Sequence, residues 1–275
     1  MKASLYPTGC SLSFDSGRVP DEKRLSEALL KDYVKSGVTY LEVSLTEEVL
    51  AKTYFMKNPE LYGEYCIRSG ATPWSFHLPF SQEIDISRTD YKGKESVELQ
   101  KKYILLAARA GIKVIVIHPS SEPIGDADRH ERLKTSRSAL RELAEYAESY
   151  GTHLAVENLP RTCLGRSAVD MLFLLEKNPK LSVCFDTNHL LGSPSANADF
   201  IRTIGNRIVT LHVSDYDFVD ERHLLPMKGE NRWKDILDAL DEIGYRGPFL
   251  YEVSGKDETL THASFRENHM ALASL

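Results

Sequence analysis

The sequence lacks several features that would place it at once in a common class of protein. Its four cysteines include no C-x-x-C pair, which excludes a disulfide framework and indicates reduced thiols. No apolar stretch approaches the ~20 residues that cross a bilayer, and no uninterrupted apolar run of secretory length follows the first residue. We therefore expect a cytoplasmic protein without a membrane partner. A glycine-rich nucleotide loop is also missing.

An excess of positive charge is missing as well. The chain has 34 basic and 40 acidic side chains, so its formal net charge is −6. A protein that holds phosphates of nucleic acid needs a cationic surface, and this composition provides none overall. We therefore do not favour a nucleic-acid partner.

What the chain does have is a regular alternation of short apolar runs and longer amphipathic stretches. After an opening strand within residues 3–14, the apolar runs predict strands at 38–45, 74–80, 112–118, 152–157, 181–186, 207–213 and 248–253. The stretches between them predict helices at 21–37, 46–70, 94–111, 129–150, 167–177, 197–205, 233–243 and 257–274. The run at 112–118 is so uniformly apolar that both faces must be buried, as in a parallel sheet. Eight strand-helix units without a linker predict an α/β fold, a (β/α)8 TIM barrel forming a single domain over residues 1–275.

In such a barrel the chemistry lies at the C-terminal ends of the strands. Seven of the predicted strands carry a metal-ligating or proton-carrying residue near this end: Glu42, His77, His118, Glu157, Asp186, His212 and Glu252. Buried carboxylates cost free energy unless they are paired or bind a metal, and the barrel brings these residues to one mouth. We therefore predict a metal site there.

The ligand types leave the identity of the metal open. A mainly oxygen set suited to Mn²⁺, Co²⁺ or Mg²⁺ is formed by Glu157, Asp186, His212 and Glu252. Zn²⁺ would be allowed by the additional histidines His77, His118, His189 and His223.

Four sequence segments at the ends of predicted strands resemble motifs of the xylose isomerase-like barrels, which include ketose 3-epimerases and endonuclease IV. The segments are VENLP with Glu157, CFDTNH with Asp186 and His189, LHVSD with His212, and LYEVS with Glu252. The resemblance to the ketose epimerases implies that Glu157, Asp186, His212 and Glu252 hold one divalent ion. It also implies that His189 contacts substrate oxygens.

The segment RHLLPMKGENRW resembles a further motif of that family, H-L-P-P-G-E-G-x-x-D-W, with two residues inserted before Gly229. His223 and Glu230 lie in this segment. We predict that they bind the substrate together with His189, His77 and His118.

The resemblance implies a metal-dependent sugar isomerase or epimerase acting on a small ketose or related polyol. An ion chelated by a carbonyl and a neighbouring hydroxyl would stabilise the enediolate that forms when the adjacent carbon loses its proton. Glu157 and Glu252 leave strands three apart in the ring, so they can approach the substrate from different sides. Proton transfer on two faces gives epimerisation, and on one face it gives aldose–ketose isomerisation.

Three alternatives stay open. An endonuclease IV-like zinc phosphodiesterase acting on abasic DNA would use His77, His118 and the D-T-N-H turn at 186–189, but its acid-x-His spacing is met only by Glu221. A dehydratase or lyase could use the same chemistry, and a barrel could bind a ligand without converting it. Association into a homo-oligomer through outer helices is also open.

Overall fold

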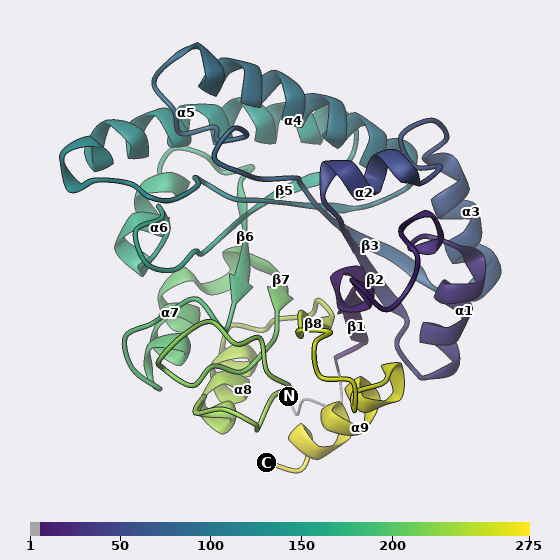
Figure 1. The fold of residues 1–275 in the computed structure, drawn as a ribbon. Helices are drawn as coiled ribbons and strands as arrows, with labels where there is room; N and C mark the ends of the chain where they lie inside the picture. The colour runs from purple at the N-terminus through teal and green to yellow at the C-terminus, as the bar shows by residue number, and fades with distance from the viewer. Residues whose placement is uncertain (1–5) are drawn as a thin grey trace.

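The computed structural model describes residues 6–275, and within them eight parallel strands surround a central axis (Figure 1). The strands are β1 (Thr8–Ser11), β2 (Tyr40–Ser44), β3 (Thr72–His77), β4 (Val114–Ile117), β5 (His153–Glu157), β6 (Ser182–Asp186), β7 (Ile208–His212) and β8 (Phe249–Tyr251). Hydrogen-bonded neighbours follow the order β7-β6-β5-β4-β3-β2-β1-β8. Backbone bonds from Val213 N to Leu250 O (2.8 Å) and from Glu252 N to Val213 O (3.0 Å) link β7 to β8. The predicted (β/α)8 barrel is confirmed.

The helices lie outside the strands, as Figure 1 shows. They are α1 (Glu27–Lys35), α2 (Glu47–Lys52), α3 (Glu60–Ser69), α4 (Tyr91–Arg109), α5 (Asp126–Ser149), α6 (Ala168–Leu175), α7 (Ala196–Ile204), α8 (Trp233–Glu242) and α9 (His262–Leu272). Short 3₁₀ turns precede or follow some of them: η2 (Leu12–Asp15), η3 (Asp21–Lys23) and η4 (Gly205–Arg207). Within residues 6–275, no helix is both long and apolar enough to cross a bilayer.

Three of the predicted helices differ from the structure. The predicted helix 46–70 is two helices, because the backbone at Thr53 is extended and Pro59 restricts the residue before it. The predicted helix 21–37 begins as η3, and α1 starts only where the side chain of Ser26 accepts a hydrogen bond from Leu29 N. The predicted helix 257–274 begins only at His262, the first residue of α9. All three errors concern helix boundaries and leave the order of strands unchanged.

The interior of the barrel is polar at its C-terminal mouth and apolar beneath that mouth. Val114, Val116, Ala155 and Cys184 form a small cluster that is separate from the main core between strands and helices. Because side chains alternate along a strand, the inward face that carries Ala155 and Cys184 also carries the residues two positions later. Those residues are Glu157 and Asp186, so the strand period itself directs both carboxylates into the mouth.

Candidate active site

Four side chains from four strand ends meet at the C-terminal mouth of the barrel. Glu157, Asp186, His212 and Glu252 each offer a ligand atom, and these atoms all lie within 4.8 Å of one another. The first three are almost completely buried, and Glu252 is partly exposed. This is the four-residue set that the sequence predicts as a metal site.

The electrostatics of this set fit a bound cation. Asp186 Oδ2 is buried and, within residues 6–275, has no hydrogen-bond partner. Burial, together with the nearby carboxylates of Glu252 and Glu157, raises the pKa of Asp186 well above its ordinary value. A divalent ion would satisfy the free oxygen and relieve the repulsion between the carboxylates.

Glu157 is surrounded by imidazoles. Its Oε2 lies 3.0 Å from His77 Nε2 and 3.3 Å from His118 Nε2, and its Oε1 lies 3.2 Å from His212 Nδ1. Burial by itself would raise the pKa of Glu157, but the charge of His212 and the hydrogen bonds from the histidines outweigh burial and hold the pKa well below its ordinary value. Glu157 is therefore held as a carboxylate.

His212 is oriented by a residue to which the sequence analysis assigned no specific role. His212 Nε2 lies 3.1 Å from Glu42 Oε2, and that oxygen also accepts a hydrogen bond from Ser75 Oγ at 2.7 Å. The other ring nitrogen, Nδ1, then faces Glu157 and Glu252, the latter at 3.3 Å. A carboxylate behind a metal-ligating histidine fixes the orientation of its ring, and Glu42 occupies that position.

Among residues 6–275, three further groups of possible ligands overlap or flank the central set, each with ligand atoms within 4.8 Å of one another. They are His77–His118–Glu157, Glu157–Cys184–His212 and His189–Glu221–His223. Glu157 therefore belongs to three of the four groups. Glu221, which the sequence identified only by an acid-x-His spacing, contributes to the group with His189 and His223.

The loops that hold these flanking residues are tied to the strand ends. Asn158 donates to Asp186 O (2.9 Å) and accepts from Asp186 N (2.7 Å), and its own carbonyl lies 2.8 Å from His189 Nδ1. The guanidinium of Arg161 pairs with Glu122 and with Glu221. These contacts anchor the loop after β7 to the loops after β4 and β5, across the mouth.

A cavity of about 370 Å³ lies over the set, within the range for sites that bind small molecules. Its wall contains most of the predicted catalytic and binding residues: His77, His118, Glu157, His189, His223 and Glu252. Glu230 lies elsewhere. Its side chain is exposed and does not line this cavity, and its backbone N–H donates to Tyr216 O at 2.8 Å. The structure therefore does not bring Glu230 to the other predicted residues.

Comparison with known proteins places this geometry in a family. The family model of the xylose isomerase-like TIM barrel matches residues 30–273. An uncharacterized protein of Methanocaldococcus jannaschii is 30% identical over 183 residues, which are 64% of this chain and 62% of that protein. A D-psicose 3-epimerase of Enterocloster bolteae is 29% identical over 141 residues, 49% of this chain and 44% of the enzyme. The matches span less than two thirds of both of these relatives.

A likeness in structure extends over the whole chain. The crystal structure of a D-tagatose 3-epimerase-like protein superposes with a TM-score of 0.79 at 23% identity, covering 100% of this chain and 98% of the other. At this identity the superposition supports the fold alone. The relative from Enterocloster bolteae is a sugar epimerase, a class of isomerase, and the structural neighbour is described as similar to one.

Proposed function

Because this chain belongs to the xylose isomerase-like TIM barrel family, we propose that it is a divalent-metal-dependent sugar epimerase or isomerase that acts on a small ketose or related polyol. The observation that carries the proposal is the meeting of Glu157, Asp186, His212 and Glu252 within 4.8 Å beneath a cavity of about 370 Å³. The D-psicose 3-epimerase among its relatives supports the ketose class.

In this proposal the same four residues hold one divalent ion. Three carboxylates and one imidazole suit Mn²⁺, Co²⁺ or Mg²⁺, and the surrounding histidines allow Zn²⁺. When bound, the ion supplies Lewis acidity that makes the carbon beside a sugar carbonyl easier to deprotonate. The chain's own side chains then have to move the proton and hold the hydroxyl groups.

Glu157 and Glu252 are the proton carriers that the geometry supports. They leave β5 and the end of β8, three strands apart in the ring, so they flank the cavity from different sides. One carboxylate takes the proton from the carbon beside the carbonyl, giving the enediolate, and the other returns a proton to the opposite face. His189 is held by Asn158 at the cavity wall, where it can bind a substrate oxygen.

Substitution of the two glutamates tests this assignment. We expect Glu157→Gln and Glu252→Gln each to lower turnover of D-psicose, D-tagatose or D-fructose by about 10²- to 10⁴-fold, because general acid–base transfer contributes that much. Circular dichroism should show a retained fold. Glu242→Gln is the matched control, because Glu242 lies on α8 and pairs with exposed Arg202.

Isotope exchange gives a second readout. Reaction in D₂O should place one deuterium at the epimerised carbon of the product, since the proton that returns comes from an exchangeable carboxyl group. A fully active Glu157→Gln variant, or a product without deuterium, would contradict the assignment.

One observation favours a second candidate, a metal-dependent phosphodiesterase acting on abasic DNA. The groups His77–His118–Glu157 and His189–Glu221–His223 provide ligands for further ions, and clustered metals suit phosphodiester hydrolysis. Elemental mass spectrometry distinguishes the two candidates. About one ion per chain supports sugar chemistry, whereas three zinc ions with salt-sensitive DNA binding would support the phosphodiesterase.

A further inference from the structure

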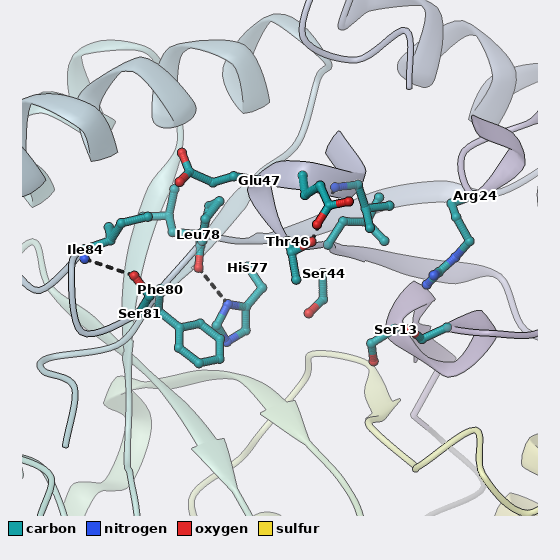
Figure 2. Close-up of a pocket in the computed structure, with 15 residues that line it drawn as sticks. Ser13, Arg24, Ser44, Thr46, Glu47, His77, Leu78, Phe80, Ser81 and Ile84 are labelled. Carbon is teal, nitrogen blue, oxygen red and sulfur yellow. Dashed lines mark hydrogen bonds between the residues drawn. The ribbon is translucent and has the colours of Figure 1, made fainter. Parts of the chain in front are cut away.

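A second cavity opens beside the mouth of the barrel, between the ends of β1, β2 and β3 (Figure 2). Its volume is about 590 Å³, and we call it the side cavity. Four residues line both it and the cavity over the predicted metal ligands: Ser13, Ser44, His77 and Phe80. The two spaces therefore adjoin, and a ligand held at the mouth can extend into the side cavity.

The space exceeds what a free ketose needs. The mouth cavity of about 370 Å³ already falls in the range that encloses a small ligand, which is roughly 300–1,000 Å³. The side cavity adds about 590 Å³, which is more than the volume of the mouth cavity. Figure 2 shows Ser13, Ser44 and His77 facing this space.

The wall of the side cavity suits a neutral polyol. Hydroxyl groups line it, from Ser13, Ser16, Ser44, Thr46 and Ser81. Within residues 6–275, the side chains of Ser16 and Ser44 have no hydrogen-bond partner, so both hydroxyls are available to a ligand. The Phe80 ring is 52% exposed and stacks on His118 at 3.8 Å between ring centroids, which leaves its other face for the apolar face of a sugar.

The charges argue against an anionic group in the same place. Arg24 is the cation in the wall, but it is almost completely buried and donates to Leu12 O. Two carboxylates, those of Glu47 and Glu48, line the same space and would repel a phosphate. Glu47 accepts a hydrogen bond from Tyr103 at 2.7 Å, and Glu48 pairs with Lys52.

We propose that the side cavity is a second glycosyl subsite, so that the substrate is a ketose that carries a further sugar unit. This inference rests on the proposed function for the reacting ketose. The ketose would lie at the mouth, and the second ring would lie between the serine hydroxyls and Phe80.

Binding of defined sugars tests the subsite separately from catalysis. The ligands are lactulose and isomaltulose, two ketoses with a second hexose, compared with D-fructose and D-fructose 6-phosphate by calorimetry on the metal-loaded protein. We expect at least one disaccharide to bind about tenfold more tightly than D-fructose, because the second ring adds contacts without a second loss of translational freedom. The corresponding kcat/KM values should rise in parallel.

A cavity-filling variant supplies the control. Val49→Trp fills the side cavity from the first turn of α2, and we expect it to remove the tenfold preference while leaving D-fructose binding unchanged. Val169→Trp, in the first turn of α6 and 78% exposed, should change neither. If Val49→Trp does not fold, Ser16→Trp fills the same cavity from an exposed turn.

Each outcome decides the inference. Equal binding of disaccharides and D-fructose, or a preference that survives the filled cavity, overturns the subsite even if free ketoses are epimerised. A preference for D-fructose 6-phosphate also overturns it in favour of an anion site. Disaccharide binding that depends on Val49, without turnover of any ketose, would keep the subsite and refute the proposed reaction.

Discussion

One prediction concerns the contact between Glu42 on β2 and His212 on β7, which meet inside the barrel. Glu42 is fully buried, and its Oε2 lies 3.1 Å from His212 Nε2. Replacing Glu42 by Gln keeps the shape but removes the charge that orients the imidazole toward Glu157 and Glu252. Loss of such a supporting carboxylate costs about 10- to 100-fold in metal affinity, which is about 1.4–2.7 kcal/mol.

The same substitution should also lower stability. Glu42 Oε1 is buried and has no hydrogen-bond partner within residues 6–275, so the amide gains nothing there, while the 3.1 Å pair with His212 loses its charge. A hydrogen bond to a charged group contributes about 1.5–3 kcal/mol and a neutral one about 0.5–1.5 kcal/mol, so the free energy of unfolding of the metal-free protein should fall by about 1 kcal/mol.

The assay is Mn²⁺ affinity, measured by calorimetry or by competition with a chelator, on protein whose fold is verified by circular dichroism. The control is Ser75→Ala, which removes the 2.7 Å hydrogen bond to Glu42 but leaves the pair with His212. Its affinity should fall much less than that of Glu42→Gln. A folded Glu42→Gln variant with wild-type Mn²⁺ affinity would refute the idea that Glu42 orients the ligand.

Two further predictions concern stability. Burial raises the pKa of the Cys66 thiol from 9.0 to about 12, so the unfolded chain loses this proton at a lower pH than the folded protein. The stabilisation from the neutral thiol is therefore present below about pH 9 and is lost as the pH rises to about 12. Urea unfolding should show this loss of stability, and Cys66→Ala should make the loss smaller. Asp85→Ala should lower the free energy of unfolding by about 3–5 kcal/mol, because Asp85 is 4% exposed and pairs with Arg132. In contrast, Glu176 forms an exposed pair with Arg137, and Glu176→Ala should lower the free energy of unfolding by at most about 1 kcal/mol.

The strands could be predicted because their signal is local. A run such as 112–118 has to be buried on both faces, and β4 (Val114–Ile117) lies inside it. The same regularity predicted where the metal-ligating side chains point, since Glu157 and Asp186 fall two residues after inward-facing Ala155 and Cys184. Helix boundaries could not be predicted in the same way, because an extended residue such as Thr53 and a proline such as Pro59 divide a stretch whose periodicity alone is continuous.

The contacts that position the side chains of the site could not be predicted from the sequence. Glu42 and His212 are 170 residues apart, and only the closed barrel shows that they face each other. Glu221 belongs to a loop without periodicity, where its pairing with Arg161 decides its position. Glu230 was placed by a motif with two inserted residues, and in the structure this loop bonds through its backbone to Tyr216 and leaves the Glu230 side chain outside.

The two candidate functions make different demands on Glu157. Its Oε2 faces His77 and His118, and its Oε1 faces His212. If those histidines only donate hydrogen bonds, they lower the pKa of Glu157 but hold the carboxylate in one position beside the cavity, where it can exchange protons with a substrate. If they ligate a second ion instead, both oxygens of Glu157 are engaged by cations, and Glu157 is too weak a base to take a proton from carbon. The number of ions at the mouth therefore also decides whether Glu157 can be a proton carrier.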